Sequence, residues 1–212
     1  IILVVLFIRL LLQWVIERVK KTKERIPVAV ATSQESCDDA IHSFCIENGI
    51  ACYRGKHQNV LARYRDACCY FSAQSCIRIS ADSPLIDPHI INMIVKSANR
   101  NEFDLVTNIA PRSFPKGQSV EMIKSEALNR LLNEKLTHEE KEHVTLGFYK
   151  RSKEYKIKNI SNQDSKYKGV QLSVDTEDDF KQIEGLLAKQ AKYEVAEGRL
   201  MSWQELVKAT LS

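Results

Sequence analysis

Glycine is scarce in this chain, with seven glycines among 212 residues, and no two of them have G-x-G or P-loop spacing. The Rossmann and Walker phosphate-binding loops are therefore excluded, because both need glycine at fixed offsets. The six cysteines form no C-x-x-C pair and no zinc spacing. This pattern predicts free thiols in a reducing, cytoplasmic compartment rather than a disulfide framework. The net charge of +4 is too small to indicate a nucleic-acid partner.

The remaining composition is that of an ordinary folded protein. Hydrophobic residues make up 44% and charged residues 27% of the chain, which fits neither disorder, collagen nor a coiled coil. A chain of this length buries roughly 70% of its unfolded surface. We therefore expect one domain over residues 1–212, in line with the usual size of about 150 residues per domain.

The N-terminus is almost continuously apolar. Its first sixteen residues are interrupted only by Arg9 and Gln13, yet a membrane span needs about 20 apolar residues. We therefore expect no membrane span. We expect no signal peptide either, because it would need a basic start and a small-residue cleavage site, and neither is present. The pattern predicts a buried strand over Ile1–Phe7 and a helix from about Leu10 to Lys23. No Gly, Pro, Asn, Asp or Ser occurs before Thr22, which suggests that a strand-to-helix loop is missing between them.

Beyond this segment, strand and helix patterns alternate. Apolar runs predict strands, and capping signals with helical spacing predict the helices that follow them. The expected strands are 27–31, 50–53, 76–79, 103–107, 119–123 and 170–174, and the expected helices begin near Ser36, Val60, Asp87, Ser125, Thr137, Thr176 and Ser202. This order predicts a single-domain α/β fold with a mainly parallel, mixed sheet and helices on both faces. The polar, basic stretch 150–168 is expected to form a hairpin arm or loop.

Two aspartates follow predicted strands. Asp82 lies in ISADSPLIDP and Asp175 in LSVDTEDDF, and ligands of such sheets bind at the carboxyl ends of the strands. Magnesium is usually held by one or two carboxylates, with phosphates and waters completing its shell. The pair is therefore a candidate Mg²⁺ and nucleotide site. The alternative is that each aspartate merely ends its strand or caps a helix.

Other polar residues occur inside regular elements or directly after them. Glu121 alternates within a predicted strand, Glu142 and His143 lie in a predicted helix, and Arg54 with Gly55 follows a strand. Arg78 lies within a strand. A lone helical histidine is more often a packing residue than a catalyst. No Ser-His-Asp or Cys-His arrangement is supported, because the glycines of a nucleophile elbow are absent.

Several segments taken together resemble a known family. The segments are LLQWVIERVKK, AVATSQESCDDAI, CYRGKHQNVLARYRDA, RISADSPLIDPHII, FPKGQSVEMIKSEAL, KEHVT and LSVDTEDDF, in this order. Over about Leu10 to Phe180 they resemble the cytidylyltransferases of acylneuraminate and spore-coat polysaccharide biosynthesis, the spore-coat type more closely. The most specific motifs are R-x-S-A-D-S-P-L-I-D-P and V-D-T-x-x-D-F.

This resemblance implies a nucleotide-diphospho-sugar transferase-like fold and a reaction in which a sugar hydroxyl attacks the α-phosphorus of CTP, releasing pyrophosphate. Asp82 and Asp175 would then hold Mg²⁺ as the catalytic pair. The residues implied near the nucleotide are Arg54, Gly55, Asn59, Arg78, Ser80 and Ala81, and those on the sugar side are Glu121, Glu142 and His143. The implied partners are CTP and a sugar, with a homodimer as a candidate assembly.

One departure from the family pattern leaves an alternative open. The family's basic, glycine-containing loop after its first strand has no counterpart between Phe7 and Leu10. The alternative is therefore a non-catalytic member that binds nucleotide or a protein partner. A guanylyl- or uridylyltransferase would share the fold but fits the motifs less well.

Overall fold

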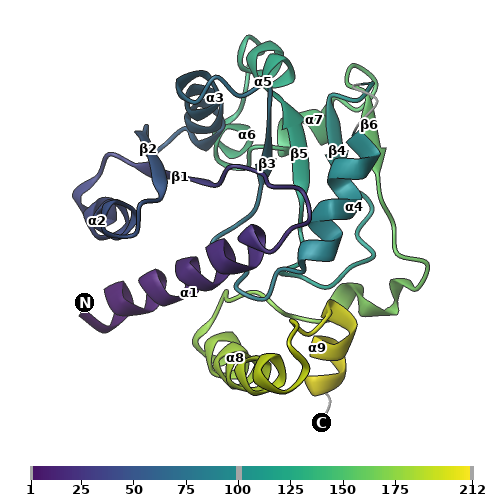
Figure 1. The fold of residues 1–212 in the computed structure, drawn as a ribbon. Helices are drawn as coiled ribbons and strands as arrows, with labels where there is room; N and C mark the ends of the chain where they lie inside the picture. Colours follow the sequence, from purple (N-terminus) through teal and green to yellow (C-terminus); the bar gives the residue numbers. More distant parts are fainter. Residues whose placement is uncertain (1, 99–101, 211–212) are drawn as a thin grey trace.

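The computed structural model describes residues 2–98 and 102–210 (Figure 1). The strands are β1 (Ala29–Ser33), β2 (Ala51–Gly55), β3 (Ser75–Arg78), β4 (Leu105–Thr107), β5 (Glu121–Lys124) and β6 (Ile157–Asn159). The helices are α1 (Ile2–Lys20), α2 (Asp39–Glu47), α3 (Val60–Tyr70), α4 (Pro88–Ala98), α5 (Ser125–Leu132), α6 (His138–Glu142), α7 (Leu146–Lys150), α8 (Glu177–Glu197) and α9 (Trp203–Thr210). Short 3₁₀ turns are η1 (Ser36–Asp38) and η2 (Ser165–Gly169).

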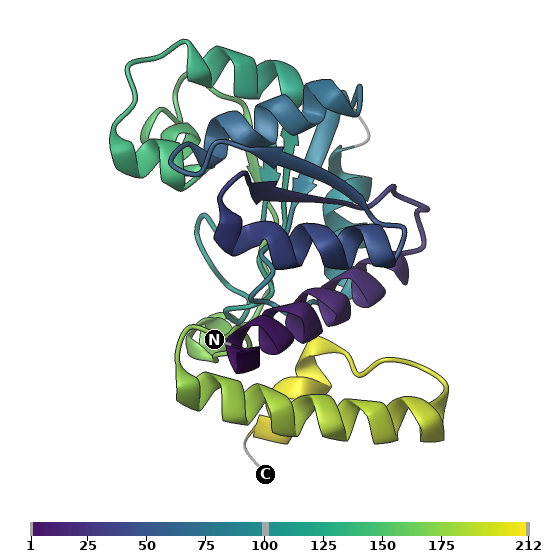
Figure 2. The ribbon, with the colours of Figure 1, turned by 90° about the vertical axis from the view of Figure 1, so that its left-hand side faces the viewer.

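The strands form two separate sheets. β1 and β2 pair in parallel, from Ala29 opposite Ala51 to Ser33 opposite Gly55. The other sheet has four strands in the order β3-β5-β4-β6, in which β5 is antiparallel to both neighbours and β6 is parallel to β4. Helices lie on both sides of these strands in Figures 1 and 2. The α/β class is therefore confirmed, but the sheet is in two pieces.

The strand predicted for Ile1–Phe7 is wrong where the structure describes it. Residues from Ile2 onward form the single helix α1, which continues to Lys20 (purple in Figure 1); Ile1 lies outside the described residues. The physical reason is the missing turn signal: without a helix breaker before Thr22, the helical hydrogen bonds continue. A fully apolar run does not by itself distinguish a buried strand from a buried helix. In the described part of the chain, no helix meets the length and apolarity that crossing a membrane requires.

The strand predicted for 170–174 is also wrong. Its backbone makes a single bridge, Lys116 with Gln171, through bonds from Lys116 N to Val170 O and from Leu172 N to Lys116 O. One bridge does not make a strand. The alternation of apolar and polar residues in this segment was therefore not enough to predict its structure. Within 150–168, residues 157–159 join the main sheet as β6 rather than pairing within a hairpin arm.

The local capping signals are confirmed in part. The caps predicted near Ser36 and at Ser125 are wrong, since the starts of η1, α2 and α5 have no side-chain cap and the Ser125 hydroxyl donates to Ala73 O instead. Thr137 with Glu140 and Thr176 with Asp179 each form a complete capping box at the start of α6 and α8. Asp87 accepts a hydrogen bond from His89 N at 2.8 Å, which fixes the start of α4. These predictions succeed because donor and acceptor lie within one helical turn.

A buried arginine joins α1 to the rest of the core. Arg18 is 1% exposed, and its guanidinium donates to the carbonyl oxygens of Ile86 at 2.6 Å and Met201 at 3.3 Å. Burial lowers the pKa of this side chain to about 10. Because these acceptors precede α4 and α9, the second half of α1 is held against α4 and beside the C-terminal helices (Figure 2).

The cysteines are free thiols in the described structure, as expected. Cys45 and Cys68 are buried, Cys52 and Cys76 are half-buried, and Cys37 and Cys69 are exposed. Cys68 and Cys69 differ in exposure although they are neighbours, because adjacent helical residues face different directions.

Candidate functional site

The structure brings the two predicted strand-end aspartates together. The segment after β3 ends at Asp82, whose backbone carbonyl accepts a hydrogen bond from the backbone N–H of Val174 at 2.9 Å. Asp175 is the next residue, so two acidic side chains that are far apart in the sequence start from adjacent backbones. Asp82 is half-buried and Asp175 is exposed, which leaves both carboxylates open to a ligand.

A close backbone approach holds the Asp175 segment in this place. Gly117 has φ +84°, and a Cβ built there would lie 2.4 Å from the carbonyl oxygen of Leu172. Only glycine fits both the left-handed backbone and this contact. The loop carrying Gly117 therefore positions the chain that leads to Asp175.

Each aspartate is oriented by one neighbour. Oδ1 of Asp82 accepts from the Ser83 hydroxyl at 2.8 Å, and Oδ2 of Asp175 accepts from the Gln171 amide nitrogen at 2.8 Å. Carboxylate oxygens with further lone pairs are the ligands that Mg²⁺ prefers. Within residues 2–98 and 102–210, no cluster of three or more His, Cys, Asp or Glu could hold a metal. Two carboxylates fit the share of a Mg²⁺ shell that a protein usually supplies, which phosphates and waters complete.

Arg54 connects β2 to the loop after β1. Its guanidinium donates to the carbonyl oxygens of Ser33 at 2.8 Å and Glu35 at 2.9 Å and pairs with Asp39 at 2.7 Å. Asn59 caps α3, since its side chain accepts from Ala62 N at 2.9 Å. Both predicted nucleotide-binding residues thus have structural partners of their own.

A polar cavity lies beside this loop. It has a volume of about 480 Å³ and brings Gly55 and Asn59 together with residues of α6. The remaining lining residues are Gln34, Glu35, Lys56, His57, Gln58, His138 and Lys141. Lys56 and Lys141 supply positive charge, which favours an anionic ligand.

Glu121 is the centre of a buried polar network. Its carboxylate, on β5, is 0% exposed and accepts from Arg78 Nη1 at 2.8 Å and from the Tyr149 hydroxyl at 2.5 Å. The Tyr149 oxygen also lies 2.9 Å from Thr107 Oγ1, and burial raises the pKa of Tyr149 far above its ordinary value. Sequence reasoning found Arg78 and Glu121 but missed Tyr149, because no local pattern signals a tyrosine that reaches another element.

The remaining predicted residues are placed separately. Glu142 is exposed and lies 3.8 Å from His138, and exposed His143 ends α6. Ser80 and Ala81 line a large apolar cavity together with Arg78. The structure thus brings together Asp82 with Asp175, Gly55 with Asn59, and Arg78 with Glu121, as three separate groups rather than one contact network.

Comparison with known proteins identifies related sequences. A family model described as Cytidylyltransferase matches residues 3–204. An uncharacterized protein of Methanocaldococcus jannaschii is 30% identical over 174 residues, covering 82% of this chain and 70% of that protein. The spore coat polysaccharide biosynthesis protein SpsF of Bacillus subtilis is 24% identical over 188 residues, covering 84% of this chain and 76% of SpsF.

Solved structures show the same fold. A cytidylyltransferase from Leptospira borgpetersenii superposes with a TM-score of 0.84 at 24% identity, covering 94% of this chain and 82% of that one. A CMP:2-keto-3-deoxy-manno-octonic acid synthetase complexed with CTP superposes with a TM-score of 0.62 at 15% identity, covering 84% and 88% of the two chains. These likenesses confirm the nucleotide-diphospho-sugar transferase-like α/β fold. Since the family model spans nearly the whole sequence, the chain belongs to the cytidylyltransferase family.

Proposed function

We propose that this protein transfers CMP from CTP to a sugar hydroxyl with release of pyrophosphate, in the synthesis of a cell-surface polysaccharide precursor. The observation that carries the proposal is the hydrogen bond from Val174 N to Asp82 O, which brings Asp82 beside Asp175. Family membership supplies the class of reaction, and the name of SpsF supports the polysaccharide pathway.

In this proposal Asp82 and Asp175 hold Mg²⁺ against the triphosphate. The ion, when bound, neutralises phosphate charge that would otherwise repel the two carboxylates and the incoming hydroxyl. The chain's own contribution is positioning. Ser83 and Gln171 orient the carboxylates, and the close approach of Gly117 to Leu172 fixes the segment that leads to Asp175. Such transfers depend on position and charge more than on a covalent nucleophile.

The other candidates divide between nucleotide and sugar. Gly55 and Asn59, on the polar cavity, are proposed to lie near the nucleotide, as are Arg54 and the Arg78–Ala81 segment. Glu142 and His143 are exposed and are proposed for the sugar side. Glu121, with no exposed surface, acts through Arg78 in this proposal, by fixing the guanidinium beside the strand end.

A second candidate function is nucleotide binding without transfer. It is favoured by the continuous helix α1, which occupies the part of the chain where family members have a first strand and basic loop. It is also favoured by Arg54 and Arg78, because their guanidinium groups already pair with carboxylates of this chain, those of Asp39 and Glu121. Binding of CTP with no release of pyrophosphate from any sugar would support this candidate.

The deciding experiment measures pyrophosphate release from CTP and Mg²⁺ with a panel of sugars. Asp82→Asn and Asp175→Asn keep the side-chain shape but remove a charge that acts in the transition state, so each should lower turnover by about 10²-fold or more. Their melting temperatures should stay near that of the wild type, because the oxygen of an asparagine side chain can still accept the bond from Ser83 or Gln171.

Asp178→Asn is the matched control. Asp178 lies in the first turn of α8, three residues after Asp175, and its side chain is 97% exposed. It shares the helix-terminus environment of Asp175 but not its contact with the Asp82 segment, so turnover should be unchanged. Near-normal turnover in both Asp82→Asn and Asp175→Asn would refute the metal assignment.

A further inference from the structure

Two cysteine pairs occupy equivalent places in successive helix–strand units. α2 is followed by β2 and α3 by β3, and each of these helices carries a cysteine near its end while the next strand carries another. The pairs are Cys45 with Cys52 and Cys68 with Cys76, and all four are free thiols.

The same turn brings each strand back beside its helix. In both units a residue with positive φ follows the helix end, Gly49 at +62° or Ser72 at +52°. The N–H of the residue after it donates at 2.8 Å to the carbonyl oxygen of the helical cysteine, Cys45 or Cys68. This is the Schellman arrangement, which ends a helix and reverses the chain. Each helical thiol therefore meets the thiol of the strand that follows it.

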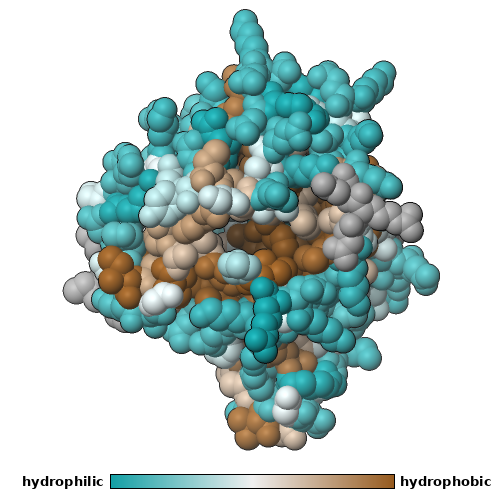
Figure 3. Space-filling view, turned by 45° about the horizontal axis from the view of Figure 1, so that its top comes forward, coloured by the Kyte–Doolittle hydropathy of each residue, from teal (hydrophilic) through white to brown (hydrophobic). Residues whose placement is uncertain are grey.

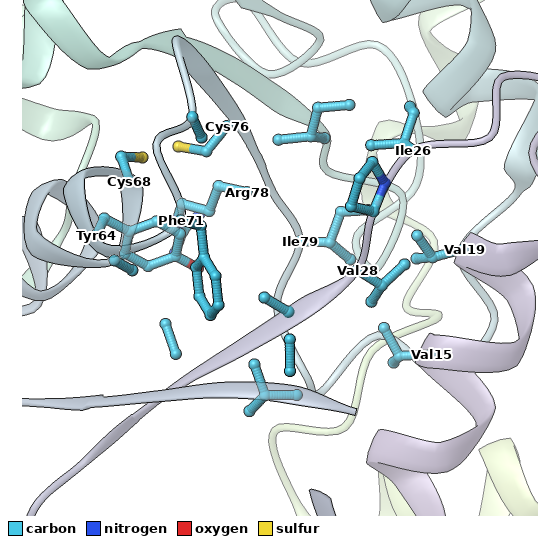
Figure 4. Close-up of a pocket in the computed structure, with 18 of the residues that line it drawn as sticks. Val15, Val19, Ile26, Val28, Tyr64, Cys68, Phe71, Cys76, Arg78 and Ile79 are labelled. Atoms are coloured by element: carbon cyan, nitrogen blue, oxygen red, sulfur yellow. The ribbon is translucent and has the colours of Figure 1, made fainter. Parts of the chain in front are cut away.

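The pair of Cys68 and Cys76 differs from the other pair in its access to a cavity. Both residues line the large apolar cavity, which has a volume of about 770 Å³, whereas Cys45 and Cys52 lie outside it. Figure 4 shows the sulfur atoms of Cys68 and Cys76 directed toward one another at the cavity wall. In the space-filling view, the surface is hollowed over a group of apolar residues and rimmed by hydrophilic ones (Figure 3). A small uncharged molecule can therefore reach this pair through the cavity.

The two pairs also differ in how readily they lose a proton. A hydrogen bond from Cys76 lowers the pKa of the Cys68 thiol below its ordinary value, and the same bond raises the pKa of Cys76. Burial instead raises the pKa of Cys45 to about 12 and also raises the pKa of Cys52. The thiolate is the nucleophilic form of cysteine. Near neutral pH, an attacking sulfur is therefore available in the first pair and not in the second.

We propose that Cys68 and Cys76 form an oxidation site, at which a peroxide that enters the cavity converts the two thiols into a disulfide between α3 and β3. The thiolate sulfur of Cys68 attacks one peroxide oxygen and the O–O bond breaks. The other oxygen leaves as hydroxide, which takes up the proton that Cys68 released and becomes water.

The second step joins the two sulfur atoms. The sulfur of Cys76 attacks the sulfenic acid formed on Cys68, the S–O bond breaks, and the hydroxyl leaves with the Cys76 proton as a second water. The two thiols together lose two electrons and two hydrogens, and one peroxide is reduced to two waters. This oxidation does not depend on the proposed function, so its test needs no activity measurement.

Peptide mapping by mass spectrometry tests the site on the intact wild-type chain. The folded protein is treated with hydrogen peroxide at neutral pH, the remaining thiols are alkylated, and the chain is digested with trypsin. Because trypsin cleaves after Lys and Arg, the two members of each pair stay on one peptide. The peptides are 66–78, with Cys68, Cys69 and Cys76, and 26–54, with Cys37, Cys45 and Cys52.

The peptide 66–78 should lose two hydrogens and carry a bridge between Cys68 and Cys76, and dithiothreitol should reverse this change. Each pKa unit changes the thiolate fraction about tenfold. The bridge should therefore form at least about tenfold faster than a bridge between Cys45 and Cys52. Equal rates in the two peptides, or full alkylation of the peptide 66–78, would overturn the proposal.

Cys69→Ser is the matched control, because Cys69 is exposed and adjacent to Cys68 in α3. This variant should keep the bridge, whereas Cys68→Ser and Cys76→Ser should each abolish it. A bridge that persists in Cys68→Ser would belong to Cys69 and would overturn the assignment, as would a bridge found only within a covalent dimer. Sulfinic acid on Cys68 without a bridge would show that Cys76 does not reach it, with the same consequence.

Discussion

Arg78 and Glu121 lie side by side on neighbouring antiparallel strands, with Arg78 Nη1 2.8 Å from Glu121 Oε2. The carboxylate has no exposed surface, whereas the arginine side chain keeps 27% of its own. The pair therefore links the interior of the four-stranded sheet to the segment that leads to Asp82.

Replacing Glu121 by glutamine should destabilise the fold. The change leaves Arg78 without its charged partner and weakens the bond from Tyr149, and breaking a buried pair of this kind costs about 3 kcal/mol. For a chain of this size that corresponds to a fall of about 6–12 °C in melting temperature, measured by calorimetry.

The control for this prediction is Glu139→Gln. Glu139 pairs with Lys150 at 3.2 Å, but its side chain is 63% exposed. Water screens such a surface pair, so its removal should change the free energy of unfolding by only about 0.5 kcal/mol. Equal effects of Glu121→Gln and Glu139→Gln would show that burial does not strengthen the Arg78 pair.

The site could be predicted from the sequence only in part. Asp82 and Asp175 were found because each follows an apolar run and matches a motif. Their juxtaposition depends on one backbone hydrogen bond between Asp82 and Val174, which no local pattern encodes. Tyr149 was missed for the same reason, since its partner Glu121 lies 28 residues away.

Glu140 supplies a prediction of pH dependence. Its carboxylate accepts from Thr137 N at 2.9 Å and from Arg151 at 2.5 Å, and these bonds lower its pKa from 4.5 to about 2. Because the folded pKa lies below the unfolded one, the stabilisation is fully present above about pH 4.5 and is lost as the pH falls toward 2. Glu140→Gln should therefore lower the urea midpoint at pH 7, and the difference from wild type should shrink between about pH 5 and pH 2.

Glu142→Gln tests whether this pH dependence belongs to the capping box. Glu142 lies in the same helix, but its side chain is 57% exposed and its neighbour His138 is 3.8 Å away. Its replacement should leave the difference from wild type nearly constant with pH. A Glu140→Gln deficit that persists unchanged at about pH 3 would contradict the assigned cause.

In the fold, too, features set by neighbouring residues could be predicted from the sequence, whereas features set by distant contacts could not. The capping boxes at Thr137 and Thr176 were predictable because both partners lie within one turn. The N-terminal segment was not, because an apolar run without turn residues is compatible with helix or strand. Residues 170–174 alternate as a strand should, yet their one β-bridge within the described residues is that of Gln171 with Lys116. Tertiary packing, rather than the local pattern, decides whether such a segment pairs with the edge of a sheet.

The final prediction concerns the two aspartates and nucleotide affinity. A triphosphate placed beside Asp82 and Asp175 brings several negative charges close to two carboxylates, and each such contact costs about 1 kcal/mol at 4 Å even in water. Titration calorimetry should therefore find CTP affinity at least about tenfold weaker in EDTA than in Mg²⁺. Asp82→Asn should reduce this ratio, because it removes both a ligand for the ion and a source of repulsion, whereas Asp178→Asn should preserve it. Equal affinity with and without Mg²⁺ in the wild type would place the triphosphate away from these aspartates, and the polar cavity lined by Lys56 and Lys141 would then be the site to test.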